Sequence, residues 1–198
     1  QWSTRTGCGY SKCPRCRAET GSLLFDRTGT MWKRMKDAFE GFEDHLIVTS
    51  VSPWLKERAE RAPILSGKKH RVVFNGLDTA VFHPYDTKYL RESLGLTDEK
   101  IIFHATPAFS LDPEHIKGGY YVSELAKRLE HSHVKVIVAG PYPSNSVLPD
   151  NMVMLGRITD QKLLAQYYSM ADVFVNATLE DNFPTTNLEA LSCGTPVI

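Results

Sequence analysis

The sequence has 198 residues, of which 42% are hydrophobic and 23% are charged. These proportions are typical of a globular protein, and they exclude a disordered tail, a collagen-like repeat and a coiled coil. Lysine plus arginine number 23 and aspartate plus glutamate also number 23, so no net positive field favours nucleic acid or anionic lipid as a non-specific partner.

The two ends of the sequence predict that it is a fragment. It begins at Gln1 with no signal peptide, and it stops after Pro196, where a buried strand is starting. A strand cut at that point leaves apolar surface and backbone hydrogen-bonding groups uncovered. No apolar stretch approaches the roughly 20 residues of a membrane-spanning helix. We expect a cytoplasmic protein, and we expect the fragment alone to be inactive.

Three of the four cysteines, Cys8, Cys13 and Cys16, form a C-x4-C-x2-C cluster near the start, and Cys193 stands alone near the end. The spacing of Cys13 and Cys16 is that of a zinc knuckle, so the cluster is a candidate zinc site. No second Cys or His pair follows it. Cysteines that pack in a loop, or that form one local disulfide, are the alternative that we favour.

In the first part of the chain, the apolar spacing from Met31 to Phe39 predicts an amphipathic helix after Thr28. Residues 46–49 read as a buried strand. A helix over 53–61 follows, capped by Ser50 or Ser52, with proline at an early helical position. A short strand is expected over 72–74, closed by a turn over 75–78.

Beyond Pro84, strands and helices alternate regularly. The predicted strands are 101–103, 134–139, 152–155 and 173–175, and the predicted helices are 119–129, 160–168 and 185–193. This order predicts an α/β fold with parallel, Rossmann-like sheets covered by helices on both faces. Ligands bind such sheets at the carboxyl ends of the strands.

Three loops at those strand ends combine glycine with polar residues. His115–Gly119 places Lys117 and Gly118 before a helix, which suits a phosphate. The loop 140–143 begins with a glycine that lets a ligand approach the backbone. The third loop, after residue 176, carries Asp181, and Glu189 follows in the next helix. Paired carboxylates suit a ligand rich in vicinal hydroxyls, and a buried carboxylate such as Glu189 needs partners.

These residues resemble the signature of family-4 (group 1) retaining glycosyltransferases of the exopolysaccharide and capsule type. Asp181-x7-Glu189, followed by the Ser-Cys-Gly-Thr-Pro-Val turn over 192–197, is similar to their Glu-x7-Glu motif. Asn-Gly-Leu-Asp over 75–78 resembles their domain-junction segment, and Lys117-Gly118 resembles their phosphate-binding Lys-Gly. Thr-Gly-Cys-Gly-Tyr over 6–10 is similar to a segment of the exopolysaccharide members.

The resemblance implies a GT-B fold of two Rossmann-like domains. Residues 1–84 would be the C-terminal part of the acceptor-side domain, and 85–198 a truncated donor-binding domain. Lys117 would neutralise the donor diphosphate, Asp181 would contact the transferred sugar, and Glu189 would bind the ribose. The remaining donor-binding residues would be Gly118, Phe183, Pro184, Thr185, Thr186 and Arg157.

The implied reaction is transfer of a sugar from a nucleotide sugar to a glycan or lipid-linked acceptor with retention of configuration. No metal is required, because a lysine and a helix terminus carry the positive charge. Peripheral association with the inner face of a membrane would use parts outside this sequence. Two features depart from the family: the first acid is aspartate, and no arginine follows the strand that contains Phe103. Either Lys117 alone then carries the positive charge, or Arg157 reaches into the site. A GT-B nucleotide-sugar epimerase and a zinc-binding module are the alternatives.

Overall fold

The computed structural model describes residues 28–42, 45–143 and 147–198. Contacts between residues divide the chain into two units, Gln1–Asn75 and Gly76–Ile198. The candidate zinc ligands Cys8, Cys13 and Cys16 lie outside the described residues.

The first unit contains a parallel strand–helix–strand arrangement. Helix α2 (Thr28–Phe39) comes first, followed by β1 (Ile47–Ser50), α3 (Pro53–Arg61) and β2 (Lys69–Val72), and β1 pairs with β2 in parallel. Ser52 is the N-cap of α3, since its hydroxyl accepts a hydrogen bond from the backbone N–H of Leu55 at 3.1 Å. The predicted α2 and α3 are therefore confirmed.

Both predicted strands of this unit differ from the structure. Ile47 in β1 is 48% exposed, so the prediction of a buried strand was wrong. The second strand is β2, which ends at Val72, and Val73 and Phe74 are exposed. The reason is the register: the last residue of β1, Ser50, pairs with Val72, so no strand residue remains to pair beyond it.

The second unit is built on a four-stranded parallel sheet. The strands β3 (Lys100–Ala105), β4 (Val134–Ala139), β5 (Met152–Gly156) and β6 (Val173–Phe174) lie in the order β5-β4-β3-β6. Val197 extends the sheet by a parallel bridge to Phe174. The strand order reverses between β3 and β6, and the carboxyl ends of strands beside such a reversal are where ligands bind.

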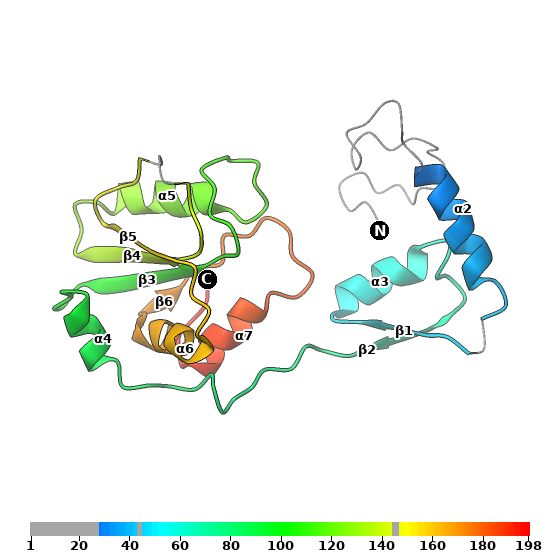
Figure 1. Cartoon of the computed structure of the whole chain (residues 1–198), viewed down its shortest axis with the longest axis horizontal. Coiled ribbons are helices and arrows are strands. Elements are labelled where there is room, and N and C mark those ends of the chain that lie inside the picture. Colours follow the sequence, from blue (N-terminus) through cyan, green and yellow to red (C-terminus); the bar gives the residue numbers. More distant parts are fainter. Residues whose placement is uncertain (1–27, 43–44, 144–146) are drawn as a thin grey trace. The chain divides into compact units, whose positions relative to one another are not determined.

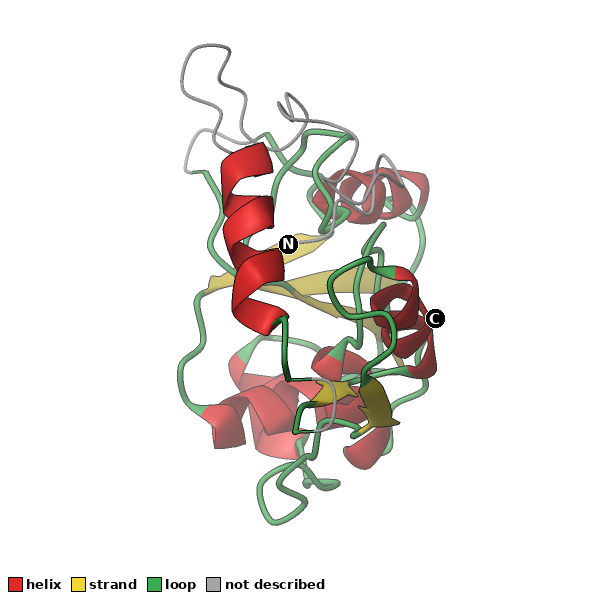
Figure 2. Ribbon diagram, turned by 90° about the vertical axis from the view of Figure 1, so that its right-hand side faces the viewer, coloured by secondary structure: helices red, strands yellow, loops and turns green. Residues whose placement is uncertain are grey.

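Helices cover both faces of this sheet (Figures 1 and 2). Helix α5 (Gly119–Arg128) lies on one face, and α6 (Gln161–Met170) and α7 (Thr185–Ser192) lie on the other. Asp160 caps α6 by accepting from two backbone N–H groups. A short helix, α4 (Lys88–Ser93), also belongs to this unit and was not predicted from the sequence.

Two hydrophobic clusters hold these layers together, one on each face of the sheet. Val136 and Val138 of β4 pack with Val122 and Ala126 of α5, whereas Ile137, the β4 residue between them, belongs to the opposite cluster. This alternation is the one expected along a strand that is covered on both faces. The second cluster includes Phe103, Tyr168 and Phe174.

The segment before Pro84 belongs to the second unit and not to the first. Phe82 is 4% exposed in the core, and the Ser192 hydroxyl donates to its backbone carbonyl at 2.5 Å. The division by contacts accordingly falls after Asn75, and the Phe82 ring is buried within the second unit.

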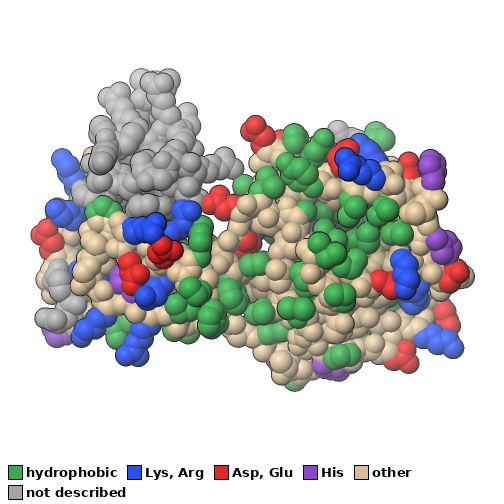
Figure 3. Space-filling model, turned by 180° about the vertical axis from the view of Figure 1, so that it is seen from behind, with side chains coloured by type: hydrophobic (Ala, Val, Ile, Leu, Met, Phe, Trp, Pro, Cys, Tyr) green, Lys and Arg blue, Asp and Glu red, His purple; other side chains and the backbone are tan. Residues whose placement is uncertain are grey.

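The surface carries acidic and basic side chains interspersed over the face seen in Figure 3. Hydrophobic side chains gather on the second unit in the same view. Within residues 28–42, 45–143 and 147–198, none of the helices has the length and apolar character needed to cross a bilayer.

Candidate functional site

A pocket of about 330 Å³ opens at the carboxyl ends of β3 and β4. It lies at the edge of the sheet where the strand order predicts a ligand site. The lining combines apolar and polar residues, and it is made by Ala105, Thr106, Pro107, Ala139, Gly140, Pro141, Arg157, Ile158, Leu164, Tyr168, Thr186 and Glu189. Three of the predicted site residues, Arg157, Thr186 and Glu189, therefore meet in one pocket.

Gly140 allows the two strand ends to approach closely beneath this pocket. A Cβ atom at this position would lie 2.4 Å from the backbone oxygen of Thr106, which is closer than atoms can pack. The backbone N–H of Thr106 also donates to the carbonyl of Ala139 at 2.9 Å. The loop glycine singled out in the sequence therefore lines the pocket and allows the close approach of Thr106.

Glu189 supplies a half-buried carboxylate on the pocket side of α7. Its Oε2 accepts a hydrogen bond from the hydroxyl of Tyr168 at 2.8 Å. Burial raises the pKa of Glu189, while hydrogen bonds from Tyr168 and Thr185 oppose that rise. A buried carboxylate held by hydroxyl donors can accept further hydrogen bonds from a ligand diol.

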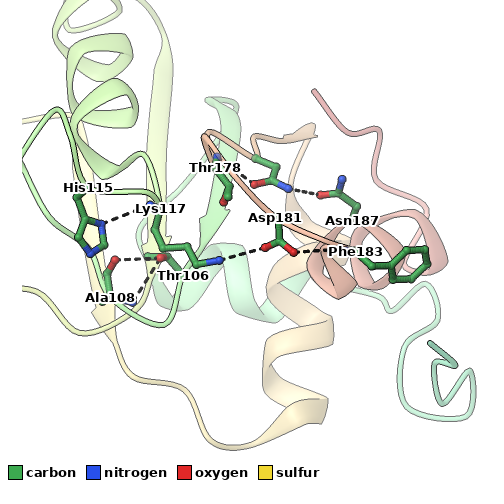
Figure 4. Close-up of polar contacts among 9 residues, drawn as sticks. Thr106, Ala108, His115, Lys117, Thr178, Asp181, Phe183 and Asn187 are labelled. Atoms are coloured by element: carbon green, nitrogen blue, oxygen red, sulfur yellow. Dashed lines mark hydrogen bonds and ion pairs between the residues drawn. The ribbon is translucent and has the colours of Figure 1, made fainter. Parts of the chain in front are cut away.

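Lys117 and Asp181 form an ion pair between two loops (Figure 4). The Lys117 Nζ lies 3.0 Å from Asp181 Oδ2, and both side chains are about three-quarters buried. Lys117 follows β3 and Asp181 follows β6, so the pair bridges the two sides of the strand-order reversal. The backbone N–H of Leu179 donates to the carbonyl of Ile116 at 2.9 Å and joins the same loops.

Gly118 makes this close approach of the loops sterically feasible. It has a left-handed backbone with φ of 69°, and an added Cβ would lie 1.9 Å from the carbonyl oxygen of Ala177. Any side chain here would be strained and would also collide with the loop that carries Asp181. The Lys-Gly pair is thus needed to bring Lys117 next to the acidic loop.

The loop from Asn176 to α7 is held by its own polar contacts (Figure 4). The Asn176 side-chain amide donates to Asn187 Oδ1 at 2.8 Å, and its oxygen accepts from the N–H of Thr178. Asp181 Oδ1 accepts from the N–H of Phe183 at 3.1 Å. Pro184 stands at the N-cap position of α7 and makes no side-chain capping hydrogen bond. The first backbone N–H groups of an α-helix have no intrahelical acceptor.

The structure separates the predicted residues into two groups. Arg157, Thr186 and Glu189 line the pocket, whereas Lys117 and Asp181 pair beside it and are absent from its lining. Tyr168 and Thr106 also line the pocket and were not predicted from the sequence. Tyr168 directly follows Tyr167 in the same helix. The sequence alone does not indicate which of the two hydroxyls reaches a carboxylate.

One group of metal-type ligands occurs in the described part of the chain, away from the pocket. Asp98, Glu99 and His133 place their ligand atoms within 4.8 Å of one another. His133 precedes β4 and Glu99 precedes β3, so this group lies at the opposite, amino-terminal edge of the sheet. His133 donates to Asp98 at 2.7 Å, and this exposed ion pair by itself accounts for the grouping.

Three comparisons with known proteins bear on this chain. Residues 110–198 match the family model described as "Glycosyl transferases group 1". The D-inositol 3-phosphate glycosyltransferase of Mycolicibacterium gilvum is 32% identical over 139 residues, which cover 64% of this chain and 30% of that protein. The chain therefore spans less than a third of the length of this curated relative.

Among solved structures, sucrose-phosphate synthase from Thermosynechococcus elongatus matches 96% of this chain and 46% of its own, with a TM-score of 0.65 and 23% identity. Anabaena HepE, in complex with UDP and glucose, matches 83% of this chain and 47% of its own, with a TM-score of 0.62 and 20% identity. The fold is thus the Rossmann-like fold of GT-B glycosyltransferases, as predicted.

Proposed function

We propose that the second unit binds the nucleotide-sugar donor of a retaining glycosyltransferase. The observation that carries the proposal is the half-buried Glu189 carboxylate in a pocket at the carboxyl edge of a parallel sheet. The match of residues 110–198 to group 1 glycosyltransferases and the UDP bound to HepE support a nucleoside diphosphate as the ligand.

The nucleoside end of the donor fits the polar lining of the pocket. Glu189 would accept hydrogen bonds from the two ribose hydroxyls, and the base would lie against the segment of Arg157 and Ile158 after β5. Thr186, in the first turn of α7, would face the phosphates with the backbone N–H groups of that turn. Phe183, Pro184 and Thr185 would complete this end of the site.

The diphosphate and the transferred sugar would lie toward Lys117 and Asp181. Lys117 would neutralise charge on the diphosphate, with Gly118 allowing it to approach, and Arg157 would replace the arginine that the family carries after its first strand. Asp181 would then contact hydroxyls of the sugar. No metal would be required in this arrangement, because two cations and a helix terminus would face the phosphates.

The finer features of the reaction follow from the resemblance of the acidic loop to the family-4 enzymes. Transfer would occur with retention, from a hexose donor to a glycan or lipid-linked acceptor in exopolysaccharide or capsule synthesis. The enzyme would act in the cytoplasm, at the inner face of the membrane. The first unit would belong to the acceptor-side domain.

Mapping of UDP binding by NMR tests the location of the site. On adding UDP to the full chain, we expect the largest shifts of backbone amide signals at Arg157, Ile158 and Thr186. Lys135, at the opposite edge of the sheet, is the internal control and should not shift. Shifts confined to the Asp98 and His133 region would contradict the proposal.

A further inference from the structure

Tyr168 lies between the core and the pocket. Its ring is fully buried, with centroids 5.1 Å from Phe103 and 5.2 Å from Phe174. Both rings meet it nearly edge-on, which is a favourable aromatic geometry. The ring therefore has little freedom to move, and its hydroxyl is presented at a fixed point at the pocket wall.

The backbone of Tyr168 is held as firmly as its ring. The hydroxyl of Thr195 donates to the Tyr168 carbonyl at 2.5 Å, and Thr195 is itself 2% exposed. Thr195 belongs to the Gly-Thr-Pro segment that leads to the bridge between Val197 and Phe174. A buried hydrogen bond thus ties the end of α6 to the last strand of the sheet.

The hydroxyl of Tyr168 reaches one oxygen of Glu189 on α7, at 2.8 Å. The Glu189 side chain has several rotatable bonds, and an unrestrained carboxylate in a pocket would sample several rotamers. The Tyr168 hydroxyl on Oε2 restrains its orientation, the Thr185 side chain adds a second hydrogen bond, and the carboxylate keeps lone pairs for further donors. Both residues line the same pocket.

We propose that Tyr168 is a positioning residue that orients the Glu189 carboxylate to receive the ribose hydroxyls of a nucleotide. The proposal rests on the proposed function, since it names the residue that prepares the ribose contact. Tyr168 acts through Glu189 and makes no contact of its own with the reacting atoms.

The electrostatic surroundings of Glu189 point the same way. Burial raises the pKa of Glu189, and the Tyr168 hydrogen bond opposes that rise, so the Tyr168 hydroxyl favours the ionised form of the carboxylate. The other titratable groups facing this region are Cys193 at the end of α7, whose thiol pKa is raised by burial, and Arg157 across the pocket. Loss of the Tyr168 hydroxyl should therefore raise the pKa of Glu189.

Tyr168→Phe tests this role because it keeps the buried ring and removes only the hydroxyl. The matched control is Tyr167→Phe, which removes a hydroxyl from the adjacent residue of the same helix, buried against Phe103 and absent from the pocket lining. By calorimetry at pH 7, Tyr168→Phe should weaken UDP binding by about 3- to 20-fold. Tyr167→Phe should change it by less than about twofold.

A second readout needs no nucleotide. The ¹³C carboxyl signal of Glu189, assigned by its loss in Glu189→Gln, reports the pKa directly. We expect that pKa to be higher in Tyr168→Phe than in the unchanged chain, and unaltered in Tyr167→Phe. As a consequence, the UDP affinity of Tyr168→Phe should begin to fall at a higher pH on acidification.

A double-mutant comparison separates positioning from general stability. In a Glu189→Ala background no carboxylate remains to be oriented, so adding Tyr168→Phe should cause no further loss of UDP affinity. An equal loss in both backgrounds would overturn the proposal, as would an unchanged Glu189 pKa and UDP affinity in Tyr168→Phe. Failure of the unchanged chain to bind UDP, GDP or ADP, with the pKa shift still present, would instead contradict the proposed function and with it any role in nucleotide binding.

Discussion

The Lys117 ammonium lies 3.0 Å from the Asp181 carboxylate, so the cation proposed to meet a diphosphate is already paired within the protein. A diphosphate and Asp181 would then compete for one positive charge. The pair is about three-quarters buried, so solvent and salt screen it only in part. This competition makes the roles of the two loops testable.

Asp181→Asn should release Lys117 and therefore strengthen UDP binding by about two- to fivefold, the range of a partly exposed ion pair. Uridine, which lacks phosphates, should bind the variant and the unchanged chain equally. Glu180→Gln is the control, because it removes the same charge one residue earlier. Calorimetric titration of the unchanged chain and the two variants measures these affinities. Equal gains in Asp181→Asn and Glu180→Gln would show a general charge effect and not release of Lys117.

Lys117→Ala should weaken UDP binding by about tenfold while leaving uridine binding unchanged, because Lys117 is expected to act on the phosphates alone. The informative quantity is the ratio of the two dissociation constants in each protein. If uridine affinity falls as much as UDP affinity, Lys117 acts by holding the loop together and Arg157 becomes the candidate phosphate ligand.

Gly118→Ala should destabilise the chain far more than Gly95→Ala. Both glycines have left-handed backbones, with φ of 69° and 66°, so both substitutions incur similar strain of about 1 to 2 kcal/mol. Only Gly118 has a neighbour where the methyl group would go, 1.9 Å away at Ala177, whereas Gly95 has nothing within 4 Å. Urea denaturation should show that Gly118→Ala loses about 1 to 3 kcal/mol more in free energy of unfolding than Gly95→Ala does. Equal losses would mean that the loops separate at little cost.

Glu189→Gln should change the pH dependence of stability. Because burial raises the pKa of Glu189 above its ordinary value of 4.5, the folded chain binds this proton more tightly than the unfolded chain. Proton binding by Glu189 therefore stabilises the folded chain fully at pH values below the ordinary pKa, and this stabilisation is lost as the pH rises through the raised pKa. The free energy of unfolding of Glu189→Gln minus that of the unchanged chain should therefore increase as the pH rises from 4 to 8. A constant difference across that range would indicate an unshifted carboxylate.

Much of the fold could be predicted from sequence because local signals coincide with it. Ser52 and Asp160 mark the starts of α3 and α6 by capping, and the apolar run of β4 is buried on both faces. The first unit was less predictable. An apolar run such as Ile47–Val48 signals burial, but whether another layer covers it depends on elements far away in the sequence.

The sequence predicts candidate residues for the site but not the contacts between them. The motifs point to Lys117, Asp181 and Glu189, yet the ion pair joins residues that are distant in sequence and depends on Gly118 admitting the Ala177 backbone. Tyr168 was not predicted as a pocket residue, because an aromatic residue in an apolar helix usually packs in the core. Its ring is indeed core, and only its hydroxyl belongs to the pocket.

The central claim is that the Glu189 pocket receives the ribose of a nucleoside diphosphate. The most direct test is calorimetric titration of UDP, GDP and ADP into the full chain and into its Glu189→Gln variant. We predict that at least one of the three binds the unchanged chain, and that Glu189→Gln weakens it by about 10- to 100-fold, as expected for lost charge-assisted hydrogen bonds. The corresponding 2′-deoxynucleotide should bind the unchanged chain more weakly than the ribonucleotide and should lose less affinity in the variant. Equal affinity of the variant and the unchanged chain for the ribonucleotide would contradict the claim.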